Sequence, residues 1–262
     1  MLPKTYFCSA LNRKRYFIQI AYDGSLYHGW QIQPNAITVQ ELLDKALSTV
    51  FRQAVETLGC GRTDSGVHAK DFYAHFDLDE IEENKVLNSI SGINALLPYQ
   101  IAAKQIIVVH DAAHARFDAT SRAYQYFIHF AKDPFKLNRS WLVKDHLNIV
   151  AMNEAAALLF DYSDFSCFSK SNTQTFTNNC KITQAFFAEI NGGLVFTIQA
   201  DRFLRNMVRA IMGTLVSVGK NELNLAGFKT IIESKNRSNA GQSVPACGLY
   251  LVKIEYPYIK ND

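Results

Sequence analysis

The sequence predicts an α+β fold of two halves, each with helices packed on a mostly antiparallel sheet. Segments of strand composition alternate with segments of helical periodicity along most of the chain. The pair Asn191-Gly192 lies between two strand-like segments and predicts an antiparallel hairpin, because both residue types accept a positive φ. We place the division near residue 110, giving halves 1–110 and 111–262, and expect a binding cleft between them.

The first half begins with a strand-like segment that ends in the turn Asp23-Gly24-Ser25. Apolar residues then recur at helical spacing directly after Thr38, whose hydroxyl is placed to cap a helix. A later helix is expected to open with the acidic run at 77–83, which we interpret as a solvated helix start. In order, we expect strand 16–22, helix 39–51, half-buried strand 72–76, helix 82–97 and buried strand 105–109.

The second half repeats this alternation. Its longest helical pattern is stopped by Gly219, since glycine favours helix ends. No low-complexity segment or long linker separates the halves, so we expect them to share an interface. In order, we expect strand 123–130, helix 147–160, a hairpin of 181–190 with 194–200, helix 203–219, helix 226–235 and strand 249–256.

Composition and charge bound the function only loosely. A chain of 262 residues with 48% hydrophobic and 19% charged residues can bury a substantial core. It has no apolar run long enough for a membrane helix and no apolar centre of a signal peptide near its start. The five cysteines form no CxxC pair, which favours reduced thiols and a cytoplasmic location. The net charge of +3 permits a nucleic-acid partner without requiring one.

The segment GCGRTDSGVHA, residues 59–69, places Asp64 in a glycine-rich turn. Its Asp-Ser-Gly could belong to an aspartic protease, but such a site needs two facing carboxylates and the chain has one such tripeptide. Asp64 could instead bond its own turn backbone, or act as a catalytic carboxylate beside a cation. Arg62, two residues earlier, would oppose the proton sharing of a protease.

The helix expected at 203–219 has an apolar face and an opposite face on which Arg202, Arg205 and Arg209 cluster. Gly213 lies on the same basic face, where a missing side chain would let a backbone approach closely. The face could be merely solvated, or it could bind phosphate or carboxylate groups.

The remaining candidates are weaker. The loop YHGWQIQ, residues 27–33, suits stacking on bases and equally suits burial. His68 and His75 are expected to pack or to form hydrogen bonds, and His110 and His114 lack the neighbours of a metal site. No P-loop, GxGxxG or nucleophile elbow occurs, so we expect no nucleotide cofactor, no other cofactor and no metal.

Taken together, these segments resemble the TruA-type tRNA pseudouridine synthases, whose signature is usually GRTDAGVHA. The similarity extends through the family's blocks in order and covers nearly the whole chain: YDGSLYHGWQIQ with TVQELLDKAL, HARFDATSRAYQYFI, FSCF, FLRNMVRAIMGTLVSVG and GLYLVKIEY. The resemblance implies the pseudouridine synthase fold of two related halves, and a homodimer. It also implies isomerisation of uridine in the anticodon stem-loop of tRNA, at tRNA positions 38, 39 and 40.

The resemblance also implies the site residues. Asp64 matches the catalytic aspartate, Arg209 the arginine that pairs with it, Tyr124 the tyrosine that packs on the target base, and Arg62 the signature arginine. With the basic face above, Arg202 and Arg205 join Arg62 and Tyr124 as expected substrate-binding residues. Three positions depart from the family, namely Ser65 for alanine, Ala123 for a basic residue and Ala210 for asparagine.

Two alternatives remain open at this point. A non-catalytic RNA-binding protein or chaperone could use the same fold without isomerising anything. A dimeric aspartic protease would use Asp64 from each of two copies. The expected partners are otherwise tRNA and a second copy of the chain, with no membrane.

Overall fold

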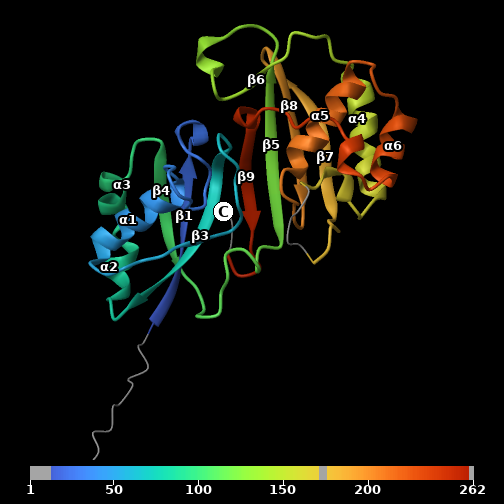
Figure 1. The fold of residues 1–262 in the computed structure, drawn as a ribbon. Coiled ribbons are helices and arrows are strands. Elements are labelled where there is room, and N and C mark those ends of the chain that lie inside the picture. Colours follow the sequence, from blue (N-terminus) through green and yellow to red (C-terminus); the bar gives the residue numbers. More distant parts are fainter. Residues whose placement is uncertain (1–12, 171–175, 260–262) are drawn as a thin grey trace, which may run out of the picture.

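The computed structural model describes residues 13–170 and 176–259, which form one nine-stranded sheet with helices packed on it (Figure 1). The strands follow the order β4-β1-β3-β9-β5-β8-β7, with β2 beside β3 and β6 beside β5. The strands are β1 Arg13–Tyr22, β2 Leu58–Gly59, β3 His68–Asp79, β4 Ile101–Val108, β5 Ser121–His129, β6 Trp141–Leu142, β7 Ile182–Ile190, β8 Gly193–Ala200 and β9 Leu249–Glu255. The helices are α1 Val39–Phe51, α2 Glu83–Leu87, α3 Ile90–Leu96, α4 Ile149–Ala157, α5 Met207–Gly219 and α6 Leu225–Glu233. This mixed, mostly antiparallel sheet with helices confirms the predicted α+β class.

The two parts of the sheet meet at β9, which lies between β3 and β5 (Figure 1). Strand β9 is antiparallel to β5 but parallel to β3, where only His68 and Ala69 have partners in register. Beyond that short parallel pairing the Asp71 carboxylate accepts a hydrogen bond from the backbone N–H of Ile254 at 3.1 Å. A buried side chain therefore continues the connection where the backbone ladder stops.

Two apolar cores lie along this sheet, one under α1 to α3 and the other under α4 to α6 (Figure 1). Partly buried Tyr124 of β5 packs against both cores, so its side chain lies where the two parts meet. Strand β4 ends at Val108 and β5 begins at Ser121. The domain division near residue 110 stays a prediction.

Helix α1 confirms the predicted range, and the Thr38 hydroxyl accepts its capping bond from Glu41 N at 3.4 Å. The single helix expected at 82–97 is wrong, because the chain breaks at Asn88-Ser89 into α2 and α3. The acidic run was also misassigned in part. Asp77 and Asp79 extend β3 and pair with Arg15 and Arg13 of β1, so only Glu82 and Glu83 lie at a helix start.

Burial of the strands differs from the prediction at β3 and β4. Strand β3 is buried on both faces, since Ala113, Ala115 and Tyr256 cover the face opposite the helices. Strand β4 is half-buried because it is an edge strand. The residues that cover β3 and the position of β4 at the sheet edge cannot be predicted from the local periodicity of these strands.

The second half follows the prediction except at the start of α5. The hairpin β7–β8 forms as expected, with Gly192 at φ +69° in its loop, and α4 runs on into a 3₁₀ turn. Helix α5 begins only at Met207, because Asn206 adopts a left-handed φ of 66°. Within the described residues, no helix is both long and apolar enough to cross a bilayer.

Candidate active site

Asp64 lies in the loop between β2 and β3, in a tight turn closed by the bond from Val67 N to the Asp64 carbonyl at 3.1 Å. Gly66 takes a φ of +79° in this turn, which a residue with a side chain would adopt only with strain. The Asp64 side chain remains one-third exposed. Its carboxylate accepts a bond from Arg209 and is not consumed by its own turn, as one sequence interpretation allowed.

Hydrogen bonds from the segment at 22–30 hold the Asp64 loop in place. The Tyr22 hydroxyl lies 2.9 Å from Thr63 Oγ1, and Trp30 N donates to the Thr63 carbonyl at 3.3 Å. Ser65 Oγ donates to the Tyr27 carbonyl at 3.3 Å, so the serine that departs from the family signature adds a hydrogen bond. These contacts fix the backbone on both sides of Asp64.

Arg209 lies in the first turn of α5 and pairs with Asp64 of the loop between β2 and β3. Its Nη1 lies 3.2 Å from Asp64 Oδ2, and its Nε donates to the Val244 carbonyl at 2.8 Å. The guanidinium is thus fixed by the backbone at 244 and directs a second donor to the carboxylate. Carboxylate and guanidinium are brought together from positions 145 residues apart, as the resemblance implied.

Gly213 explains how that backbone reaches α5. A Cβ atom on Gly213 would lie 1.9 Å from the Gln242 carbonyl oxygen. The predicted close approach at Gly213 is therefore confirmed, and the approaching chain is the segment that carries Val244.

Tyr124, on β5, is the third residue of the group that contains Asp64 and Arg209. Its ring packs edge-on against Phe203 with centroids 5.2 Å apart. Burial raises the pKa of its hydroxyl, and the charge of nearby Asp64 raises it further, so the phenol stays neutral near Asp64. Cys60, close to the same group, has its pKa raised to about 12 by burial and is not a thiolate nucleophile.

The prediction that Arg202, Arg205 and Arg209 share one face of a helix is wrong. Because α5 starts at Met207, Arg202 and Arg205 lie on the preceding loop and only Arg209 lies on the helix. Arg62 is exposed, and its charge acts on Arg116, together with that of Arg202. Among the described residues, the exposed Arg205 side chain forms no hydrogen bond or ion pair with Asp64.

The aromatic loop at 27–33 is buried at its rings, so its interpretation as a base-stacking surface is not supported. Tyr27 and Trp30 are almost fully buried, and Trp30 packs on Phe72 with centroids 4.3 Å apart. Gly29, at φ +88°, is where this backbone passes closest to the Asp64 loop, since a Cβ there would lie 2.3 Å from the Thr63 carbonyl oxygen. The loop supports the site from within.

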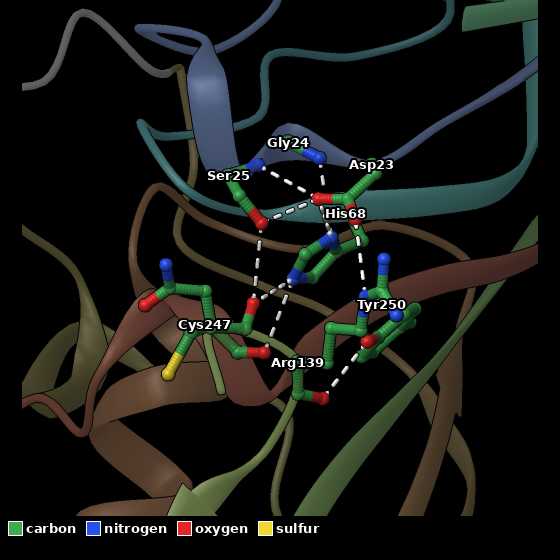
Figure 2. A network of polar contacts seen from close by, with 8 residues as sticks. Asp23, Gly24, Ser25, His68, Arg139, Cys247 and Tyr250 are labelled. Atoms are coloured by element: carbon green, nitrogen blue, oxygen red, sulfur yellow. Dashed lines mark hydrogen bonds and ion pairs between the residues drawn. The ribbon is translucent and has the colours of Figure 1, made fainter. Parts of the chain in front are cut away.

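His68, four residues after Asp64, anchors the start of β3 (Figure 2). Its Nδ1 accepts from Gly24 N at 3.1 Å, and its Nε2 lies 3.0 and 3.2 Å from the carbonyl oxygens of Asn138 and Cys247. Burial lowers the pKa of His68, although Asp23 lies 3.2 Å from Nδ1 and opposes this shift. Nδ1 is then the acceptor and Nε2 the donor of a neutral ring.

Other contacts extend this network around the histidine. Arg139 pairs with Asp23 at 3.3 Å, and the Tyr250 hydroxyl donates to the Arg139 carbonyl at 2.8 Å (Figure 2). The predicted hydrogen-bonding role of His68 is confirmed, as is that of His75, whose Nδ1 accepts from Ala115 N. Over residues 13–170 and 176–259 no group of three or more metal-ligand residues gathers anywhere.

Arg122 is the residue that the sequence analysis missed. It precedes Tyr124 by two positions on β5, a spacing that places both side chains on one face of the strand. Its guanidinium donates to the backbone carbonyls of Cys60 and Asp201, at 3.2 and 2.9 Å, and so links the Asp64 loop to the loop before α5. The strand periodicity beside Tyr124 could have indicated it.

Known proteins resemble this chain over almost its whole length. Residues 155–257 match the family model described as tRNA pseudouridine synthase. The chain is 51% identical to tRNA pseudouridine synthase A of Bacteroides fragilis, over 93% of this chain and 97% of the relative. It is 49% identical to the protein of that name from Bacteroides thetaiotaomicron, over 93% and 91%, and 38% identical to that from Treponema denticola, over 94% of each.

Proposed function

This chain belongs to the tRNA pseudouridine synthase A (TruA) family and isomerises uridine to pseudouridine in tRNA, and from that premise we propose that Asp64, Arg209 and Tyr124 form its active site. The observation that carries the proposal is the pairing of Asp64 with Arg209, 3.2 Å apart and contributed by distant segments. An aspartic protease would need a second carboxylate where this guanidinium lies.

The reaction breaks the bond between the ribose and N1 of uracil, turns the base, and joins the ribose to C5. A proton leaves C5 and one is gained at N1, so substrate and product are isomers and no oxidant or group donor is consumed. A carboxylate that is ionised and partly exposed can attack covalently or accept a proton. Asp64 is one-third exposed in this site, and its carboxylate is paired with the Arg209 guanidinium.

Arg209 orients the carboxylate. Because its Nε is fixed on the Val244 carbonyl, the guanidinium holds Asp64 Oδ2 in one direction and leaves Oδ1 available for the substrate. Tyr124 offers its ring to the target base beside the carboxylate. A stacked uridine must leave its helix to reach Asp64, which costs a few kcal/mol that such packing and phosphate contacts would offset.

We place the target uridines in the anticodon stem-loop, and we propose that the active form is a homodimer in the cytoplasm, where tRNA is modified. Arg62 and Arg202 are exposed or partly exposed cations near the site that suit the RNA backbone. Arg205 is retained as a more distant phosphate contact. Light scattering of the purified protein, alone and with tRNA, would test the dimer directly.

The test is incubation with unmodified tRNA transcripts, mapping pseudouridine by position, with Asp64→Asn in parallel. We expect pseudouridine in the anticodon arm with the wild-type protein and none with Asp64→Asn, while the variant keeps its thermal stability and most of its tRNA affinity. Activity retained by Asp64→Asn would overturn the assignment of the carboxylate. Tight tRNA binding with no product from the wild type would instead point to a non-catalytic RNA-binding protein.

A further inference from the structure

Arg122 is a junction between three backbone segments. Its Nη1 donates to the carbonyls of Asp201 at 2.9 Å and Ala119 at 3.3 Å, and its Nη2 to those of Arg116 at 2.6 Å and Cys60 at 3.2 Å. Four of the five N–H groups of a guanidinium are thereby directed at backbone oxygens. The residue gathers the Asp64 loop, the segment at 116–119 and the loop before α5 around one positive charge.

Each of those segments carries another arginine. Arg62 follows Cys60 by two residues, Arg116 is itself a carbonyl partner of Arg122, and Arg202 directly follows Asp201. The pKa of Arg116 lies below its usual value, first because of partial burial and then because of the positive charges of Arg62, Arg122 and Arg202. The Arg116 guanidinium is therefore close enough to those of Arg62, Arg122 and Arg202 to be repelled by them.

No ion pair within the described residues neutralises this positive charge. Among residues 13–170 and 176–259, no carboxylate forms an ion pair with Arg62, Arg116, Arg122 or Arg202. The adjacent Asp201 carboxylate accepts instead from the backbone N–H groups of Lys181 and Arg202. Like charges held together without a counterion destabilise a fold, and an anionic ligand would relieve that repulsion.

The position of the cluster indicates which anion it takes. Arg62 lies two residues from Asp64, and Arg122 lies two residues from Tyr124 on β5. A nucleotide bound with its base at Asp64 carries a backbone phosphate on either side of its ribose, so a phosphate is the anion most readily brought to these arginines. Phe117, 74% exposed and 5.7 Å from the Arg116 guanidinium, adds an aromatic surface that suits RNA better than an acidic peptide.

We propose that Arg62, Arg116 and Arg202, positioned by Arg122, form a single subsite for one backbone phosphate of the RNA next to the target uridine. The inference rests on the proposed function, and adds to it Arg116 as a binding residue and Arg122 as a positioning residue. Arg122 acts through the three others, since most of its donors are directed at carbonyl oxygens.

The experiment pairs a charge removed from the protein with a charge removed from the RNA. Arg116→Gln and Arg202→Gln are assayed with anticodon-arm RNAs that carry one neutral methylphosphonate at each linkage in turn around the target. We expect each variant to raise Kd about tenfold with kcat within about twofold, and to reduce the salt slope of log K by about one. Lys229→Gln, an exposed charge on α6, is the matched control and should change none of these.

One linkage should account for the effect. Its methylphosphonate should weaken wild-type binding by more than either single variant does, and should cost each single variant less than it costs the wild type. Additive losses at every linkage would overturn the subsite. So would variants that lose kcat while their Kd stays unchanged.

Arg122→Lys tests the positioning role, because it keeps the charge but loses the fork that binds several carbonyls. We expect it to abolish the coupling between Arg116 and that linkage, even at temperatures where circular dichroism shows the variant fully folded. Preserved coupling would make Arg122 merely structural. Binding measurements need no turnover, so failure of the wild type to form pseudouridine would count against the proposed function and leave the subsite test intact.

Discussion

Gly213 offers a sharp test of how the fold supports the site, through the substitution Gly213→Ala. The new Cβ would lie 1.9 Å from the Gln242 carbonyl oxygen, so the backbone there must move by roughly 1 Å or more. Overpacking against backbone costs up to about 3 kcal/mol, and the better helix propensity of alanine returns about 1 kcal/mol. We expect a net loss of about 2 kcal/mol, or roughly 4 to 8 °C in Tm for a chain of this size.

Activity should fall with stability, because the displaced segment carries the Val244 carbonyl that holds Arg209. A shift of about 1 Å at an orienting group can cost on the order of 100-fold in turnover, so we expect kcat to fall 10- to 100-fold. The assay is pseudouridine formation at saturating RNA, at a temperature where circular dichroism shows both proteins folded.

The matched control is Gly92→Ala in α3, where a new Cβ meets only Val50 Cγ2 at 3.9 Å. The same chemical change should there raise Tm by roughly 2 to 4 °C, through helix propensity alone, and leave kcat unchanged. If Gly213→Ala matched Gly92→Ala in either measurement, the reasoning from the close approach would be refuted. A lower Tm with wild-type kcat would show that the segment at 242–244 does not hold Arg209.

Three further predictions concern the support of the site and the pH dependence of stability. Thr38→Ala removes the cap of α1 and should lower the free energy of unfolding by about 1 kcal/mol in urea titrations; an unchanged midpoint would contradict the cap. Tyr22→Phe removes the hydroxyl 2.9 Å from Thr63 and should cost about 1 kcal/mol and several-fold in kcat, an expectation that fails if single-turnover rates are unaffected. The pKa of His75 is lowered to about 4 by burial and by nearby Arg15 and His114, so below about pH 6.5 the unfolded state binds its proton first and stability falls until about pH 4. His75→Gln should lack this loss, which amounts to up to about 3 kcal/mol of unfolding free energy. The wild type and the variant must be compared directly, because burial raises the pKa of Asp44 to about 6 and this shift changes stability in the opposite direction. Parallel pH profiles of the two proteins would refute the His75 contribution.

The extent to which sequence predicted this structure depended on how local each determinant is. Helix α1 was correct to the residue because its periodicity and the Thr38 cap lie within the segment itself. The start of α5 was wrong because the apolar period continues through 203–206, whereas Asn206 turns left-handed and donates to the Ser243 hydroxyl. That partner is 37 residues away and leaves no mark in the helical pattern.

The site showed the same contrast. Asp64 could be identified from the sequence because consecutive residues form its turn. Its distant partner Arg209 was identified only through the family resemblance. Arg122 escaped notice because its four acceptors are backbone carbonyls, which every residue possesses and no sequence motif records. The acidic run failed for a related reason, since Asp77 and Asp79 find their arginines on a neighbouring strand.

Strand β9 has a consequence for how the protein is made. It follows every other described strand in the chain, yet it lies between β3 and β5, and its Tyr250 pairs in register with His68. At about 5 to 20 residues per second, a ribosome needs roughly 10 to 40 s to proceed from one of these partners to the other. Until β9 is made the edge of β3 stays open, and once β5 has been synthesised its edge stays open too, with Asp64 already in the chain. A translation product that stops before β9 lacks the strand that joins the two parts of the sheet.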